Sequence, residues 1–203
     1  GADEAAKLGG ELTPVGAEKA GNADGTIPAW TGGITKAPAG FKEGDHYPNP
    51  FAGEKAKFTI SASNMGQYAA NLTAGQQALL KKYPTWKMNV YPTHRTAAYP
   101  QAIYEASKAN ATRVKLAPGG NGFDGASVGV PFPIPKTGVE PMLNHITAYR
   151  GDSFAVSNQQ VAVTTGGSYT PVRFEYEYDF HYNNLRKSPA DREDNKLTNF
   201  LQT

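Results

Sequence analysis

The chain has 203 residues, a formal net charge of +2 and no cysteine. The missing cysteine excludes disulfides, thiolate catalysis and cysteine-ligated metal, and so small a charge does not favour nucleic acid or an anionic membrane as partner. No apolar run is long enough to cross a bilayer, so we expect no transmembrane segment.

Residues 1–57 hold half of the 22 glycines and few aliphatic side chains. Such a stretch buries too little apolar area to fold by itself. Isolated hydrophobic residues, among them Trp30 and Phe51, are spaced along it. We therefore expect residues 1–57 to form an extended arm that is pinned to an α+β domain of residues 58–203.

The middle of the chain is predicted to be mostly helical. Thr73 and Gln76 have the spacing of a capping box, which predicts a helix to about Tyr83 with Leu79 and Leu80 turned inward. A short strand is expected from Lys87 to Tyr91, a second helix from Pro100 to about Ala111, and a loop over 115–125. A third helix is expected over 138–150, with an apolar face formed by Val139, Met142, Leu143, Ile146 and Tyr149.

The pattern changes to strands after Gly151. Two long strands, over 154–165 and 168–183, flank Gly166-Gly167, which is a hairpin signal. In the second strand, hydrophobic residues alternate with polar ones, which predicts an antiparallel sheet that is covered on one side only. The apolar positions are Val172, Phe174, Tyr176, Tyr178, Phe180 and Tyr182.

This aromatic row has two interpretations. It packs against the protein's own core, or it lines a cavity for an apolar guest. Burial of such side chains is strongly favourable, at roughly 1.5–3 kcal/mol each, which suits a core. The tyrosine hydroxyls need partners when they are buried, which suits the wall of a cavity that holds an amphiphile.

No motif in the chain indicates a cofactor, a metal or a catalytic centre. Residues 120–125 match G-x-G-x-x-G, but no helix follows them, so we interpret them as a glycine-rich loop. The four histidines lack metal-ligand spacing, and no nucleophile elbow is present. Glu175 and Glu177 could imitate a glycosidase pair, but acids on the open side of an amphipathic strand are usually its solvent face. His145 fits a structural histidine better than a ligand.

Several long blocks of the sequence resemble one family of proteins. The blocks are residues 8–33, 91–100, 129–135 and 144–151. They are similar to a large proteobacterial family of unknown function that is often described as outer-membrane lipoprotein-sorting-like. Where that family commonly has tryptophan before its Asn-His pair, this chain has Leu143, which stays apolar but lacks the large ring.

The resemblance implies a fold like that of the periplasmic lipoprotein carrier and its receptor. That fold is a curved antiparallel sheet, a partial and unclosed barrel, with helices on its concave side. It also implies a periplasmic location, a neighbouring resistance-nodulation-type exporter and a chain that is the N-terminal part of a longer protein, with any signal peptide removed. No catalytic residues carry over.

We therefore expect a periplasmic binding or carrier protein for a hydrophobic or lipid-like molecule, working with an envelope exporter. Phe174, Tyr176, Tyr178 and Phe180 would line the concave side of the sheet. Met142, Leu143 and Ile146 would pack there as a lid. The alternatives are a non-enzymatic adaptor of an envelope transport complex, and a hydrolase of envelope glycans or lipids that uses Glu175 and Glu177 or His145.

Overall fold

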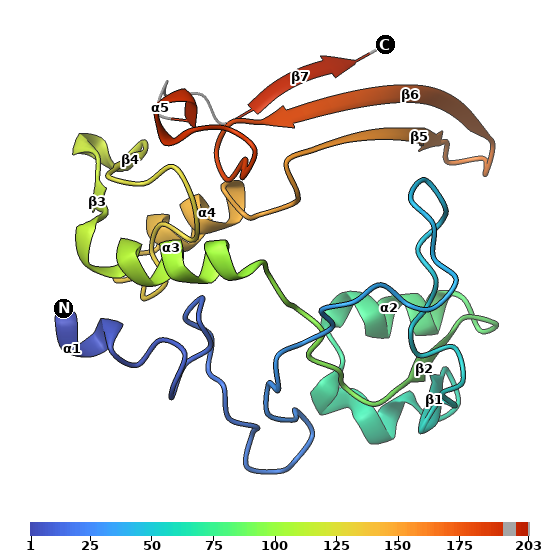
Figure 1. Ribbon diagram of the computed structural model, residues 1–203. Helices are drawn as coiled ribbons and strands as arrows, with labels where there is room; N and C mark the ends of the chain where they lie inside the picture. Colours follow the sequence, from blue (N-terminus) through green and yellow to red (C-terminus); the bar gives the residue numbers. More distant parts are fainter. Residues whose placement is uncertain (193–197, 203) are drawn as a thin grey trace. The chain divides into compact units, whose positions relative to one another are not determined.

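The computed structural model describes residues 1–192 and 198–202 and shows a mixed helix and sheet architecture (Figure 1). The chain divides into two compact units. One contains residues 1–20 and the chain from Tyr99 onward, and the other contains residues 21–98. The boundary that we expected after residue 57 lies inside the second unit, and the expected arm stays a prediction.

The unit of residues 21–98 is built around a small antiparallel ribbon. Its elements are β1 (Phe58–Ser61), a 3-10 helix (Met65–Asn71), α2 (Ala74–Lys82) and β2 (Lys87–Val90). Ile60, Leu72 and Leu80 form its buried core. Residues 21–57 contain no helix or strand, and the Trp30 indole N–H donates to the Ala97 carbonyl at 2.9 Å.

Helix α2 begins as the sequence predicts. The Gln76 N–H donates to Thr73 Oγ1 at 3.2 Å, and the Thr73 N–H donates to Gln76 Oε1 at 2.9 Å, so both halves of the capping box are present. The inward face was predicted only in part, because Leu80 is fully buried whereas Leu79 is 43% exposed.

The other unit contains the remaining helices and the larger sheet. Its elements are α1 (Ala2–Ala5), α3 (Gln101–Arg113), β3 (Lys115–Leu116), a 3-10 turn (Pro118–Gly120), β4 (Phe123–Asp124), α4 (Val139–Ile146), β5 (Ser153–Val163), β6 (Tyr169–Phe180), α5 (Pro189–Arg192) and β7 (Thr198–Gln202). Strands β5, β6 and β7 form one antiparallel sheet in that order, and within the described residues it is not closed into a barrel. The predicted α+β class is confirmed.

Three local expectations in this unit need correction. The expected loop over 115–125 contains the short β3–β4 hairpin. The connection between β5 and β6 is longer than two residues: the Thr164 N–H donates to the Ser168 carbonyl at 2.9 Å, and Gly167 has a φ of 83° that a residue with a side chain adopts poorly. Helix α4 ends at Ile146 rather than near Arg150.

Candidate functional site

The aromatic row exists as one continuous face of the β5–β6 hairpin. Phe174, Tyr176, Tyr178 and Phe180 follow one another on β6, with successive ring centroids 5.8, 6.3 and 6.1 Å apart. The register places Phe154 opposite Tyr178, and these two rings are 4.6 Å apart. All four β6 rings remain partly exposed, so the row is a surface in the described structure.

The opposite face of the hairpin is polar around the middle of β6, whereas nearer the turn it carries Val161, Val163 and Tyr169. Glu175 and Glu177 lie in the polar part, opposite Ser157 and Ala155 of β5. Arg173 forms an ion pair with Glu175 at 3.0 Å and donates to Ser157 Oγ at 3.1 Å. The two glutamates that could imitate a glycosidase pair therefore sit on the side away from the aromatic row.

Helix α4 faces the opposite way from the prediction. Met142 is 64% exposed, Ile146 is 55% exposed and Leu143 is half-buried, whereas Glu140 and Thr147 are buried. The extensive contacts of β6 are with β5 and β7 and not with α4. Among the described residues, α4 thus makes no extensive contact with β6, and the expected packing of Met142, Leu143 and Ile146 on the aromatic row stays a prediction.

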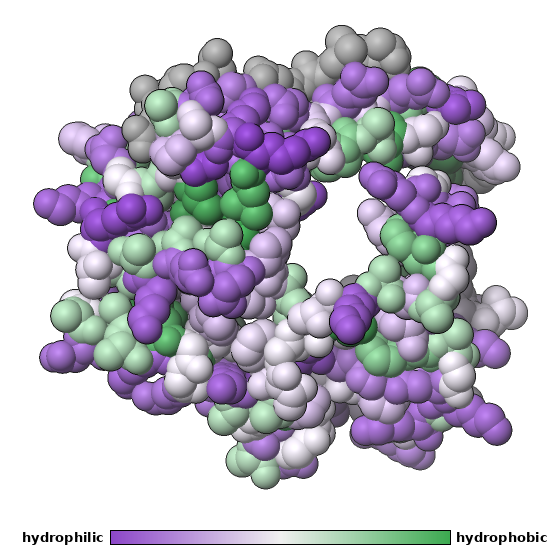
Figure 2. Space-filling model, viewed as in Figure 1, coloured by the Kyte–Doolittle hydropathy of each residue, from purple (hydrophilic) through white to green (hydrophobic). Residues whose placement is uncertain are grey.

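Hydrogen bonds explain why the polar side of α4 is turned inward. The Glu140 carboxylate accepts from the backbone N–H groups of Lys136 and Thr137. The Asn144 amide makes two bonds to the backbone of Phe132, accepting at 2.9 Å and donating at 2.7 Å. Buried polar groups with partners cost little, so this face is stable inside, while Met142 and Ile146 stay outside. Figure 2 shows exposed hydrophobic surface in the region that α4 occupies in Figure 1.

The residues that organise this region are ones that the sequence analysis did not select. Asn110, Ser107 and Asn183 are almost fully buried, and each bonds the backbone of the loop over 128–130. Asn110 Nδ2 donates to the Val128 carbonyl at 2.8 Å, the Val130 N–H donates to Ser107 Oγ at 2.8 Å, and the Gly129 N–H donates to Asn183 Oδ1 at 2.6 Å. The only sequence signal was that Ser107 and Asn110 share the helix face of Ile103.

Tyr182 completes this network from beyond the end of β6. Its hydroxyl donates to the Gly129 carbonyl at 2.7 Å, and its ring contacts the Phe123 ring edge-to-face at 5.7 Å. Burial raises the pKa of the Tyr182 hydroxyl well above its usual value. Tyr182 is thus part of the core, which corrects its place in the predicted strand.

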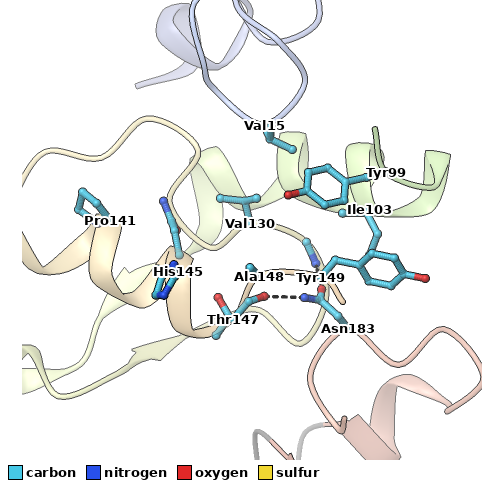
Figure 3. Close-up of a pocket in the computed structure, with 12 residues that line it drawn as sticks. Val15, Tyr99, Ile103, Val130, Pro141, His145, Thr147, Ala148, Tyr149 and Asn183 are labelled. Carbon is cyan, nitrogen blue, oxygen red and sulfur yellow. Dashed lines mark hydrogen bonds between the residues drawn. The ribbon is translucent and has the colours of Figure 1, made fainter. Parts of the chain in front are cut away.

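A pocket of about 310 Å³ opens beside this loop (Figure 3). Apolar side chains form much of its wall, namely Val15, Ile103, Val130 and Pro141. The rings of Tyr99 and Tyr149 also line it, and His145 lies at the end near Pro141. Asn183 lines it too and joins its two sides, because Asn183 Nδ2 donates to the Thr147 carbonyl at 2.6 Å. Within the described residues, no group of three or more histidine and acidic side chains could hold a metal ion.

Together these features define an α+β protein with an open antiparallel sheet, whose one face carries partly exposed aromatic rings. Residues 59–203 match the family described as "Protein of unknown function (DUF1329)", and the chain belongs to that family.

The chain is also 48% identical over 202 residues to the uncharacterized protein PA3922 of Pseudomonas aeruginosa. The aligned region covers 99% of this chain and 44% of that relative. No solved structure matches the chain. Within the described residues, no helix has both the length and the apolar character needed to cross a membrane.

Proposed function

We propose that this protein is a periplasmic binding or carrier protein for a hydrophobic or lipid-like molecule, acting with an envelope exporter. The observation that carries the proposal is the aromatic row of β6, whose rings contact one another but remain partly exposed. A contiguous apolar surface of this kind on a soluble domain typically marks a binding site.

The polarity of this sheet face suits an amphiphile. Phe154, Tyr178 and Phe180 give one end of the face three mutually contacting rings. Toward the hairpin turn, the register places Asn158 opposite Phe174 and Gln160 opposite Val172. An apolar tail would lie over the rings, and a polar head would reach the amides and tyrosine hydroxyls.

The similarity to the lipoprotein-sorting-like family supports the finer parts of this proposal. In that fold the sheet is curved and helices occupy its concave side, and in this protein strands from a longer chain would complete the cavity. Residues 1–57 would be an arm across the domain, and this chain would be the N-terminal part of the carrier. Cargo transfer would follow from displacement of α4 or a loop.

The test compares variants on the two faces of the hairpin. Tyr176→Glu and Phe180→Glu put charge into the aromatic row, and Ser157→Glu puts the same charge on the polar face. We expect the first two to weaken binding of 11-(dansylamino)undecanoic acid at least about tenfold, because a buried unpaired charge is costly. Ser157→Glu should bind as the parent does.

Circular dichroism decides between a cavity and a core. Variants that stay folded but do not bind the dye support a carrier. Global unfolding of Tyr176→Glu and Phe180→Glu would instead make the row part of a core, and unchanged dye binding in folded variants would refute the site. Mass spectrometry of an organic extract of the purified protein would identify the cargo.

A second candidate function is an adaptor in an envelope transport complex. The exposure of Met142 and Ile146 on α4 favours it, because an uncovered apolar helix face suits a protein partner. The adaptor would be supported if this chain captures the periplasmic domain of an exporter and an organic extract of the chain contains no lipid. Loss of that capture in Met142→Lys would place the contact on α4.

A further inference from the structure

We propose that the pocket between α3 and α4 is a second binding site, separate from the aromatic row, and that it takes a small uncharged aromatic molecule with a hydrogen-bonding substituent, of the phenol class. This inference goes beyond the proposed carrier function, because the pocket lies off the sheet face and is lined by other residues.

The walls of the pocket are held in place before any ligand arrives. The backbone from Val128 to Phe132 forms hydrogen bonds with three side-chain amides. Asn110 donates to the Val128 and Val130 carbonyls, Asn183 accepts from the Gly129 N–H, and Asn144 accepts from the Phe132 N–H and donates to the Phe132 carbonyl. Asn110 and Asn183 are buried and Asn144 is half-buried, so these bonds fix the shape of the loop closely. A rigid wall lowers the cost of ordering on binding.

The loop also approaches α3 too closely for a side chain. Gly129 has a φ of 82°, and a Cβ there would lie 2.6 Å from the Ser107 nitrogen. Only glycine allows the loop to take this position, so this wall of the pocket depends on Gly129.

The size and lining of the pocket indicate a single substituted ring. An apolar cavity of about 150 Å³ can hold benzene, so about 310 Å³ has room for a ring with substituents but not for a two-chain lipid. The Tyr99 and Tyr149 rings meet edge-to-face with centroids 6.2 Å apart, and Ile103 and Val130 supply aliphatic surface. Aromatic ligands pack well in such a wall.

The polar groups of the pocket select an uncharged ligand that forms hydrogen bonds. None of the residues that line it is an acid, a lysine or an arginine. Within the described part of the chain, the Tyr99 hydroxyl and the His145 imidazole have no hydrogen-bond partner. Figure 3 shows the Tyr99 hydroxyl directed toward the Val130 side of the pocket, with His145 at the opposite end. A phenolic hydroxyl can donate to one of these groups or accept from the other.

The experiment uses fluorine NMR of 4-fluorophenol with the whole 203-residue chain. We expect line broadening that excess phenol relieves, and broadening of fluorobenzene that is weaker. Tyr99→Phe should weaken 4-fluorophenol binding about 3- to 10-fold and leave fluorobenzene unchanged, because only a hydrogen bond is removed. Val130→Phe, which fills the pocket, should abolish binding of both probes.

Tyr47→Phe is the matched control, because Tyr47 is 90% exposed and lies in the other unit. Broadening that phenol does not relieve, or that both pocket variants leave unchanged, would overturn the site. Broadening that Val130→Phe removes and Tyr99→Phe leaves intact would overturn the ligand class. Binding of 11-(dansylamino)undecanoic acid should be the same in Tyr99→Phe as in the parent. The dye tests the carrier proposal and 4-fluorophenol tests the pocket, so the failure of one proposal can be distinguished from the failure of the other.

Discussion

Asn183 shows how one residue joins separate segments of the chain. Its side chain accepts from the Gly129 N–H at 2.6 Å and donates to the Thr147 carbonyl at 2.6 Å, while its own backbone has a φ of 68°. Asparagine suits both tasks, because it tolerates the left-handed region and carries a donor and an acceptor.

Two substitutions separate these contributions. Asn183→Ala should lower the free energy of unfolding by about 2–4 kcal/mol, because two buried backbone groups lose their partners. Asn183→Gly loses the same bonds but adopts a positive φ freely, so we expect it to be about 1 kcal/mol more stable than the alanine variant. Urea denaturation followed by circular dichroism measures both values. Losses below about 0.5 kcal/mol in both variants would show that the network contributes little.

Because Tyr182 is buried, we expect the protein to lose stability at alkaline pH. Burial raises its pKa in the folded state, so above about pH 10 the unfolded chain releases the phenolic proton and the folded chain keeps it. Below about pH 10 the raised pKa of Tyr182 does not reduce the free energy of unfolding. Above about pH 10 the free energy of unfolding falls by up to about 1.4 kcal/mol per pH unit. Urea denaturation between about pH 8 and pH 11 should show a shallower fall in Tyr182→Phe than in the parent. Equal slopes would contradict the assignment.

At the scale of elements, α4 carries its hydrophobic face outward. Met142→Ser and Ile146→Ser should change the free energy of unfolding by less than about 0.5 kcal/mol, because both side chains are already exposed. Glu140→Ala should cost about 1–3 kcal/mol, because the N–H groups of Lys136 and Thr137 lose their acceptor. Thermal or urea denaturation ranks the three variants, and an Ile146→Ser cost equal to that of Glu140→Ala would place this face in a core.

Strands β5 and β6 form a long two-stranded ribbon that supports the aromatic row. They pair along their whole length, from Ser153 opposite Asp179 to Val163 opposite Tyr169, whereas β7 pairs only with the part of β6 from Tyr176 to Phe180. The aromatic row therefore rests on a ribbon that is two strands wide over much of its length. Such a ribbon supports its own register but covers neither of its faces.

At the scale of the molecule, the described residues include apolar surfaces that are open to solvent, among them the partly exposed aromatic row and the outer face of α4. The chain spans 44% of the length of PA3922, so that relative contains much additional chain. We expect the 203-residue chain to enhance the fluorescence of 1-anilinonaphthalene-8-sulfonate more, per mole, than full-length PA3922 does, because added strands and helices would cover these surfaces. Equal enhancement would mean that the surfaces stay open in the longer protein.

The features that the sequence predicted correctly are local ones. The capping box at Thr73 and the alternation along β6 each depend on neighbouring residues, whose spacing fixes the backbone geometry. The mixed α+β class follows from the same periodicities. The continuous row of rings on one face of β6 could also be predicted, because side chains on a strand alternate strictly.

The tertiary structure decided which surfaces are covered. Periodicity gives a helix an apolar face but does not say that this face is inside, and in α4 the paired Glu140 and Asn144 are turned inward instead. Asn110 and Asn183 lie far apart in the chain, and nothing local marks them as partners of one loop. The sequence alone thus determined the amphipathic pattern and the spacing of the residues. Burial depended on the tertiary structure, because a polar side chain is stable in the interior only where a distant backbone group forms a hydrogen bond with it.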